Sequence, residues 1–240
     1  FFVFGIEFAV SSLSRVYGSL DPPSFSHITK RLWGPQKIMN PSLPIGKLWN
    51  PCTNNPMKQS ELAPGILVAL PNLQDPYFSK TAILLCNYNE EGAFGLVMNH
   101  PSDLKVTEIL KEEFQNHNDL EMPLLIGGPV QPESFWAVHT SDYLCESSTE
   151  ISSRIALSAG QDILMAILDG SGPKTYHLGV GYSGWGAFQL DREIQEESWW
   201  LAPLDESLIM DMEYDHRWEC ILDNLGISPY TALFTKSGHV

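Results

Sequence analysis

Short apolar runs separated by polar turns mark the stretch that begins near residue 62. The runs at 65–70 (GILVAL), 81–86 (TAILLC) and 95–98 (GLVM) have the length and composition of buried strands. A polar turn at 87–92 joins the second run to the third and is too short for a parallel crossover. We therefore predict an antiparallel hairpin here.

Further along the chain, apolar residues alternate between strand-like runs and helical spacing. Strands are predicted at 124–126, 135–139 and 176–180, and helices at 104–114, 161–168, 189–197 and 215–225. The last helix has the cleanest apolar face and a stop signal at Gly226. Because strands come in groups between single helices, without strict βαβ alternation, the pattern indicates the α+β class with a mixed, largely antiparallel sheet.

The first 56 residues read differently from the rest. They are dense in proline, which breaks both helix and strand periodicity, and they lack the basic start and cleavage site of a secretory signal. We predict that residues 1–56 are an N-terminal extension outside the fold, that Met57 is the true start, and that 57–240 form a single domain. An organelle-targeting leader is the alternative.

Charge divides the chain at the same place. Residues 1–56 contain two acids and five bases, whereas the remainder contains 27 acids and nine bases, a net charge of −18. So negative a surface repels phosphate backbones, which argues against direct nucleic-acid binding.

The four cysteines are far apart, and two of them, Cys86 and Cys220, lie in or beside apolar faces. These two are interpreted as packed thiols. A cytoplasmic protein with no membrane segment is expected.

A glycine-rich segment at 179–186 is the most conspicuous motif. Its GVGYSG portion matches the dinucleotide-binding pattern GxGxxG, but it lies late in the chain and precedes an acidic helix, so we interpret the match as accidental. The aromatic and hydroxyl residues between these glycines, Tyr182, Ser183 and Trp185, allow two interpretations: a loop that contacts a ligand or partner, or a tight strand-to-helix connection with Trp185 in the core.

Two other loops carry polar residues of interest. Gln131 and Glu133 follow a Gly-Gly-Pro sequence, and Asp75 precedes a proline. Each of these side chains can line a pocket, and each can equally cap nearby backbone groups. No GxSxG, P-loop or paired-histidine motif accompanies them, and the histidine of His139-Thr-Ser-Asp is interpreted as a hydrogen-bonded loop residue. No catalytic residue, metal site or cofactor is therefore predicted.

Three motifs in order, PNLQDPYFSKTAILLCNYNEEGAFGLVMNHP, LLIGGPVQPE and GVGYSGWGAFQLDREIQEESWW, closely resemble the bacterial YqgE/AlgH family over about residues 62–226. The resemblance implies an α+β fold with a bifurcated sheet, part of it a small barrel, surrounded by helices. Members of this family are described either as uncharacterised proteins or as regulators of transcription for exopolysaccharide synthesis, and the resemblance implies no more than this about function. His100 departs from the family, which more often has Arg or Lys there.

These observations favour a non-enzymatic regulatory or adaptor protein that acts through protein partners. The alternative is a small-molecule-binding protein or an unrecognised enzyme, in which the loops of Asp75, Gln131 and Trp185 would converge on one pocket. Direct binding to DNA, the literal sense of a transcriptional regulator, is disfavoured by the net charge and by the lack of a helix-turn-helix pattern.

Overall fold

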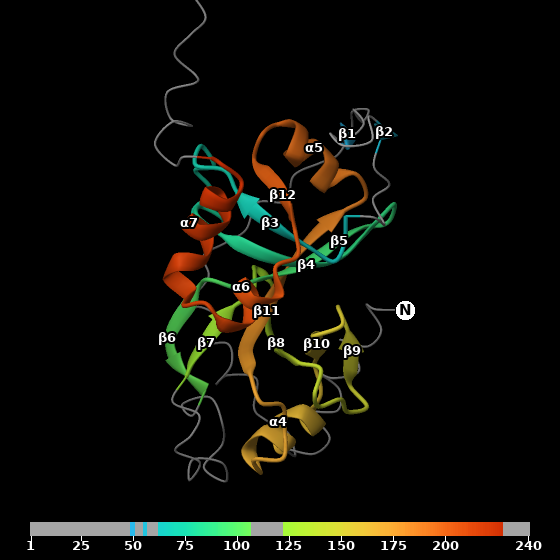
Figure 1. Cartoon of the computed structure of the whole chain (residues 1–240), viewed down its shortest axis with the longest axis vertical. Helices are drawn as coiled ribbons and strands as arrows, with labels where there is room; N and C mark the ends of the chain where they lie inside the picture. Colours follow the sequence, from blue (N-terminus) through green and yellow to red (C-terminus); the bar gives the residue numbers. More distant parts are fainter. Residues whose placement is uncertain (1–48, 51–54, 57–61, 107–121, 228–240) are drawn as a thin grey trace, which may run out of the picture. The chain divides into compact units, whose positions relative to one another are not determined.

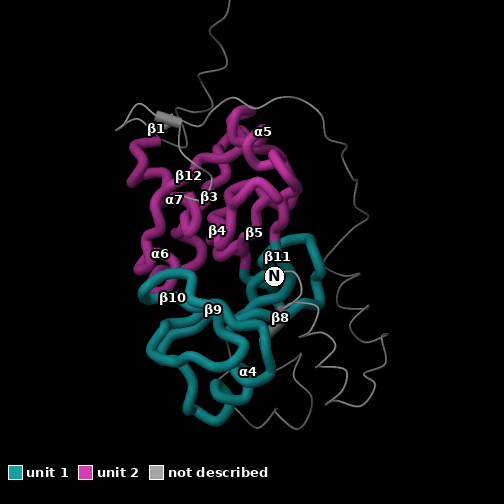
Figure 2. Tube along the Cα trace, turned by 90° about the vertical axis from the view of Figure 1, so that its right-hand side faces the viewer, with its two compact units in different colours: residues 1–39, 101–182 teal, residues 40–100, 183–240 magenta. Residues whose placement is uncertain are grey.

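The computed structural model of the chain describes residues 49–50, 55–56, 62–106 and 122–227. These residues form two compact units (Figure 2). Among the described residues, unit 1 contains 101–106 and 122–182, and unit 2 contains 49–50, 55–56, 62–100 and 183–227. Strand β11 (Tyr176–Gly186) contributes residues to both units.

Unit 2 is built on an antiparallel sheet with the order β12-β3-β4-β5-β11 (Figure 1). Its strands are β3 (Gly65–Ala69), β4 (Ala82–Asn89), β5 (Gly92–Val97), the end of β11 and β12 (Trp199–Pro203). Two further short strands, β1 (Trp49–Asn50) and β2 (Asn55–Pro56), pair with each other. The predicted hairpin is thus confirmed as β4–β5.

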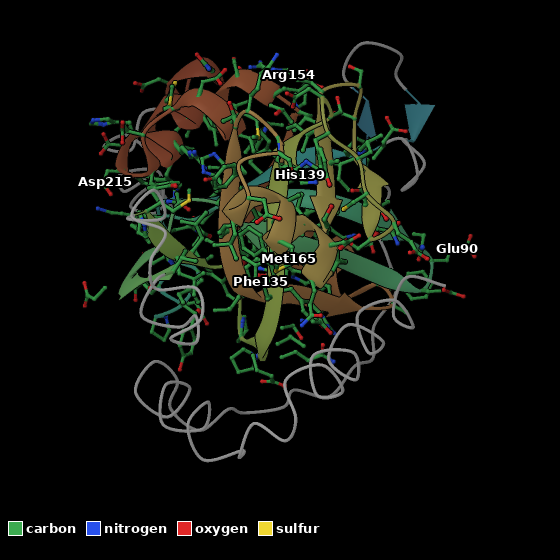
Figure 3. The ribbon with its side chains drawn as sticks, turned by 90° about the horizontal axis from the view of Figure 1, so that it is seen from below. Glu90, Phe135, His139, Arg154, Met165 and Asp215 are labelled. Carbon is green, nitrogen blue, oxygen red and sulfur yellow. The ribbon has the colours of Figure 1, made fainter. Side chains whose placement is uncertain are left out.

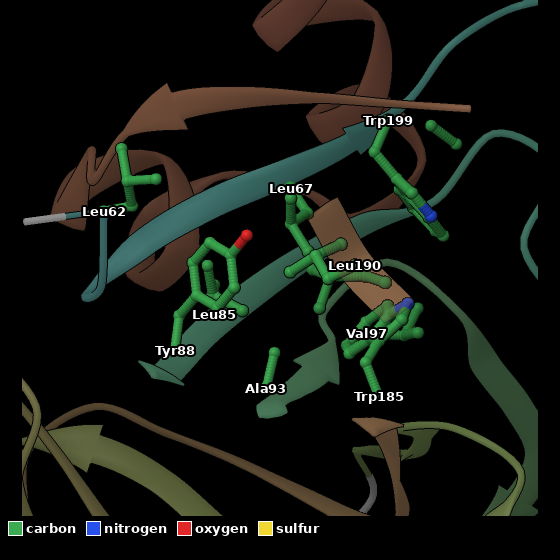
Figure 4. Packing of buried hydrophobic residues seen from close by; sticks show 11 residues of the cluster. Leu62, Leu67, Leu85, Tyr88, Ala93, Val97, Trp185, Leu190 and Trp199 are labelled. Atoms are coloured by element: carbon green, nitrogen blue, oxygen red, sulfur yellow. The ribbon is translucent and has the colours of Figure 1, made fainter. Parts of the chain in front are cut away.

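Alternate residues of this sheet face two different sets of helices. Leu67 and Leu85 join a buried cluster that includes Leu190 of α5 (Gln189–Gln195) (Figure 4). The neighbouring residues point to the opposite face because side chains alternate along a strand. Helix α7 (Tyr214–Asn224) contacts β3 and β4, and its Trp218 indole N–H donates to the carbonyl of Ala69 at 2.7 Å.

A buried arginine ties α7 to the sheet. Arg217 is fully buried, at 0% exposure. Its guanidinium donates to the carbonyl oxygen of Met98 at 2.6 Å and twice to that of Met212, at 2.8 and 3.0 Å. The guanidinium also lies 4.7 Å from the ring centre of Tyr214. Burial lowers the pKa of Arg217 to about 10, so the side chain remains a cation at neutral pH.

Unit 1 contains a second antiparallel arrangement, with the order β9-β10-β8-β11, and a parallel pairing of β7 with β11. Its strands are β6 (Pro101–Lys105), β7 (Pro123–Ile126), β8 (Val130–Thr140), β9 (Ser148–Glu150), β10 (Ile155–Ser158) and the start of β11. Helix α4 (Gln161–Leu168) packs its apolar side chains into the core of this unit. The sheet branches at β11, because β5, β7 and β8 each pair with this strand.

The α+β class and the mixed, largely antiparallel sheet are confirmed, as are the helices predicted at 161–168, 189–197 and 215–225, with small shifts at their ends. Gly226 follows α7 with φ of 70°, as a helix stop requires. The helix predicted over 104–114 is wrong at its start, because residues 104 and 105 belong to β6. Residues 107–121 lie outside the described residues, so the rest of this helix stays a prediction. The predicted start at Met57 also lies outside them and stays a prediction.

Two segments expected as loops are strands instead. Residues 182–186 continue β11 because they pair with β5, and residues 130–133 begin β8. Strands β6, β9, β10 and β12 and helix α6 (Glu206–Asp211) were not predicted, because each is six residues or shorter and shows too few periods of its pattern. Within the described part of the chain, no helix combines the length and apolarity needed to cross a membrane.

Replacing Arg217 with methionine should lower the free energy of unfolding by roughly 2–5 kcal/mol, because the carbonyls of Met98 and Met212 lose a charged donor in a buried setting. Urea denaturation of the full chain measures this change. Lys174→Met is the matched control, since the Lys174 side chain is 87% exposed and its ion pair with Asp142 is long, at 4.0 Å. Equal stability of Arg217→Met and the wild type would contradict the structural role.

Candidate functional site

Asp75 acts on its own backbone. Its Oδ1 accepts hydrogen bonds from the N–H groups of Tyr77 and Phe78, at 2.8 and 3.0 Å, which closes the turn after Pro76. The turn presents Phe78 to two tryptophans of unit 2, with ring centres 6.4 Å from Trp185 and 5.5 Å from Trp199. Asp75 therefore caps the backbone of its own turn, and a role in binding a ligand or partner stays a prediction.

Trp185 is a core residue, 6% exposed, and its partner is a carboxylate that the sequence did not single out. The indole N–H of Trp185 donates to Oε2 of Glu193 at 2.8 Å, and the indole N–H of Trp199 donates to the same oxygen at 2.9 Å. The two rings meet edge to face, with centres 5.9 Å apart. Gln189 donates to the other oxygen, Oε1, at 2.9 Å. One carboxylate of α5 thus fixes the ends of β11 and β12.

The glycines of the GxGxxG match have a packing reason within unit 1. A Cβ on Gly179 would lie 2.1 Å from a ring carbon of Trp136, and Gly181 has φ of 68° at an irregularity in the β8–β11 pairing. The Trp136 indole N–H donates to the carbonyl of Gly181 at 2.7 Å. These glycines therefore make room for a buried indole, which differs from their use in cradling a pyrophosphate.

Gln131, Glu133 and Tyr182 lie on neighbouring strands of unit 1. Gln131 has φ of 43°, and its Oε1 accepts from the Ser134 hydroxyl at 3.0 Å. Tyr182 pairs with Val130, the residue before Gln131, and burial raises the pKa of its phenol. Glu133 is exposed. The structure therefore brings Gln131 and Tyr182 close to each other.

The remaining nominated residue, Ser183, is fully buried opposite Gly95 in unit 2. Unit 2 thus holds Ser183, Asp75 and Trp185, and unit 1 holds the other three. Within unit 2, Phe78 links the Asp75 turn to Trp185. A single pocket formed by the Asp75, Gln131 and Trp185 loops stays a prediction.

Unit 1 contains a connected polar network that the sequence did not reveal. His139 lies among the strands (Figure 3), with Nε2 2.8 Å from the Ser158 hydroxyl and Nδ1 3.0 Å from the Thr140 carbonyl. The Ser158 hydroxyl is 2.8 Å from that of Ser148, which lies 3.2 Å from the thiol of Cys145. The chain of contacts therefore runs from a thiol to an imidazole through two hydroxyls.

The chemistry around this network favours a structural role. His139 and Ser158 are fully buried, so the imidazole is not exposed to solvent. The neighbouring carboxylate of Asp162 accepts from the hydroxyl and the backbone N–H of Ser147, at 2.6 and 2.9 Å. The network therefore anchors the 145–148 loop to α4 and β10. Among the described residues no cluster of His, Cys, Asp and Glu is suited to a metal ion.

The most distinctive exposed feature of unit 2 is the strand β12. It lies at the edge of the sheet, beside β3 (Figure 1), and the described residues offer it no second neighbouring strand. Trp199 points into the core, whereas Trp200 points to the other face and is 48% exposed. Acidic pairs flank the strand: Glu196 and Glu197 before it, and Asp205 and Glu206 after it.

The charge of the surrounding segment is strongly one-sided. Residues 183–227 contain 11 acids and two bases, a net charge of −9. One of the two bases, Arg217, is fully buried, which leaves Arg192 as the cation of this segment with access to solvent. Hydrogen bonds from the Ser207 hydroxyl and from two backbone N–H groups lower the pKa of Asp205, which keeps that carboxylate ionised. The surface around β12 is therefore anionic.

Replacing Glu193 with alanine should lower the free energy of unfolding by about 2–4 kcal/mol, because two nearly buried indole N–H groups lose their acceptor. Glu193→Gln keeps a carbonyl acceptor and should cost less. Urea denaturation followed by tryptophan fluorescence reports both changes. The control is Glu196→Ala on the exposed side of the same region. A Glu193→Ala protein as stable as this control would rule out the carboxylate as the link between the tryptophans.

Acid should destabilise the protein partly through His139. Burial lowers the pKa of His139, so the folded state binds fewer protons than the unfolded state, whose histidines titrate near pH 6.5. The free energy of unfolding should consequently fall as the pH drops below about 6.5. His139→Gln should flatten this slope, and His216→Gln, a substitution at an exposed position, is the matched control. Identical slopes for both variants would refute the assignment to His139.

Comparison with known proteins gives a consistent result. The model of the AlgH-like family matches residues 66–230. A UPF0301 protein from Methylococcus capsulatus is 38% identical over 184 residues, which are 74% of this chain and 96% of that protein. A UPF0301 protein from Xanthomonas campestris is 36% identical over 181 residues, 74% of this chain and 96% of its own length.

The structural comparison agrees. The solution structure of the AlgH protein from Pseudomonas aeruginosa matches with a TM-score of 0.60 and 34% identity, covering 77% of this chain and 100% of that chain. A crystal structure from Corynebacterium diphtheriae, 23% identical, covers 73% of this chain and 94% of that chain with a TM-score of 0.59, which indicates a shared fold. The resemblance noted from the three sequence motifs is thereby confirmed: the chain belongs to the AlgH-like family.

Proposed function

We propose that this protein is a non-enzymatic regulatory or adaptor protein of the cytoplasm that acts by binding a basic protein partner. The observation that carries the proposal is the charge of residues 183–227, a net of −9 with one of the two cations buried. Such a surface attracts positively charged partners and speeds their association, and it repels nucleic acid. A regulatory effect on transcription would then pass through a protein that itself contacts DNA.

The local roles of the nominated loop residues support this choice over a small-molecule site or an enzyme. Asp75 caps a turn, Gln131 accepts from Ser134, and Trp185 donates to Glu193. Each of these residues has a hydrogen-bond partner within its own unit, which is the commoner use of polar loop residues. The exposed carboxylates of Glu196 and Glu197 face solvent, where a partner protein can contact them.

The test is quantitative capture of partners by the full chain from a native lysate, followed by mass spectrometry. The wild type should enrich basic proteins, and 300 mM salt should release them, because screening weakens contacts between exposed charges. The variant Glu196→Gln/Glu197→Gln should retain roughly three- to tenfold less of each partner.

The matched control is Glu90→Gln/Glu91→Gln, an equally exposed acidic pair at the β4–β5 turn of the same unit, which should capture like the wild type. Trp185→Ala is unsuitable as a binding variant because it opens the core. Capture that ignores both salt and the Glu196/Glu197 change would overturn the proposal, as would enrichment confined to acidic proteins.

A further inference from the structure

Strand β12 lies at the edge of unit 2, and part of its backbone faces away from β3. Trp200 pairs with Val68 of β3, and the N–H of Leu70 donates to the carbonyl of Ser198 at 3.0 Å. In an antiparallel pair every second residue directs its N–H and C=O toward the partner strand. Trp200 and Ala202 therefore direct theirs toward β3, and Trp199 and Leu201 direct theirs outward. Within the described part of the chain, no strand pairs with that outward side.

We propose that this outward edge of β12 is the docking site for an extended, basic segment of the partner protein, which pairs with β12 as an added strand. The inference rests on the function proposed above and specifies its contact surface. An extended peptide gains affinity from main-chain hydrogen bonds to a sheet edge and specificity from its alternate side chains. Trp199 is 3% exposed, so its outward backbone groups are covered, whereas Leu201 is partly exposed. The outward N–H and C=O of Leu201 therefore supply the hydrogen bonds.

Charge selects the occupant. Glu196 and Glu197 precede the strand, and Asp205 and Glu206 follow it, so both ends of the edge are anionic. The five residues of β12 span about 17 Å at roughly 3.4 Å per residue. A complementary segment therefore carries cationic residues at both of its ends, separated by about five residues that favour the extended conformation. A second copy of this acidic chain would place like charges opposite one another.

Trp200 gives the site an aromatic contact. Its side chain is 48% exposed, on a strand whose neighbouring tryptophan is 3% exposed, and it lies beside the edge where the added strand would run. A Lys or Arg side chain over the face of an indole gains attraction in addition to the pairing of charges. Exposed tryptophans of this kind are enriched at protein interfaces.

The experiment uses the full chain and a fluorescein-labelled peptide, Arg-Arg-Thr-Val-Thr-Val-Thr-Arg-Arg, with Glu in place of Arg in the matched peptide. Fluorescence anisotropy gives Kd for each. The wild type should bind the Arg peptide and not the Glu peptide. Trp200→Ala should weaken binding about three- to thirtyfold through the lost cation–π contact. Phe188→Ala, which removes an aromatic residue of similar exposure at 46%, should leave Kd unchanged.

The hydrogen bonds are tested by Leu201→Pro, which removes the outward N–H, beside Leu201→Val, which keeps it and also shortens the side chain. Binding should be lost in the first and change less than twofold in the second, with circular dichroism and urea denaturation verifying that both variants fold. If Leu201→Pro does not fold, the Trp200→Ala and Phe188→Ala pair decides the question alone.

Several results would overturn the docking site. Binding of the Arg peptide that is salt-dependent but equal in Trp200→Ala and Leu201→Pro would mean that charge alone attracts the partner elsewhere. Failure of the wild type to bind the Arg peptide, beside lysate capture that still depends on Glu196 and Glu197, would reject this edge and leave the adaptor function standing. Concentration-dependent dimers in sedimentation equilibrium, lost in Leu201→Pro, would assign the edge to a second copy.

Discussion

One carboxylate organises the aromatic core of unit 2. Glu193 receives the indole N–H groups of Trp185 and Trp199 on a single oxygen, and this bond pair holds α5 against the ends of two strands. Because the rings are nearly buried, the alternative to this arrangement is two polar groups without acceptors in an apolar setting. The position of Trp199 in turn fixes the register of β12 on β3, which sets Trp200 outside and decides which backbone groups line the edge. Glu193 therefore stabilises the aromatic core of this unit and, through Trp199, determines which side of β12 faces outward.

Much of the fold was predictable because it is encoded locally. The β4–β5 hairpin and the helices α4, α5 and α7 each show several periods of their pattern, and the hairpin has a polar turn of matching length. The segment 182–186 was misread as lying outside a strand, because glycines usually indicate turns, whereas here Gly184 and Gly186 pair with β5. These glycines pair with Phe94 and Gly92, which lie 90 and 94 residues earlier in the chain, and no local sequence pattern indicates such a distant pairing. The short β10 and β12 present four and five residues, too few to establish alternation.

The candidate site was harder to predict, because polar residues in loops look alike in sequence whether they serve the backbone or a ligand. Asp75 and Gln131 were nominated as ligand- or partner-binding residues, which stays a prediction, and the structure gives both of them local partners. Glu193 was hidden among four acids of one helical segment, and only the three-dimensional fold distinguishes the one that faces the tryptophans. Trp200 had a readable signal: two adjacent tryptophans in a strand point to opposite faces, so one of them lies on the side away from the Trp185 cluster.

An open strand edge has a consequence for how the protein behaves in concentrated solution. Among the described residues no strand pairs with the outward side of β12, so the outward backbone groups of Leu201 are a template for an extended chain, including another copy of the same protein. Mutual repulsion between anionic molecules keeps copies apart while the carboxylates are ionised, since the formal net charge is −15 at pH 7. Near the isoelectric point, about pH 4.7, that repulsion vanishes while the edge remains. Colloidal stability in this protein is thus an electrostatic property of the same surface that presents its edge strand. Acidification removes the repulsion between copies, and the protein then precipitates.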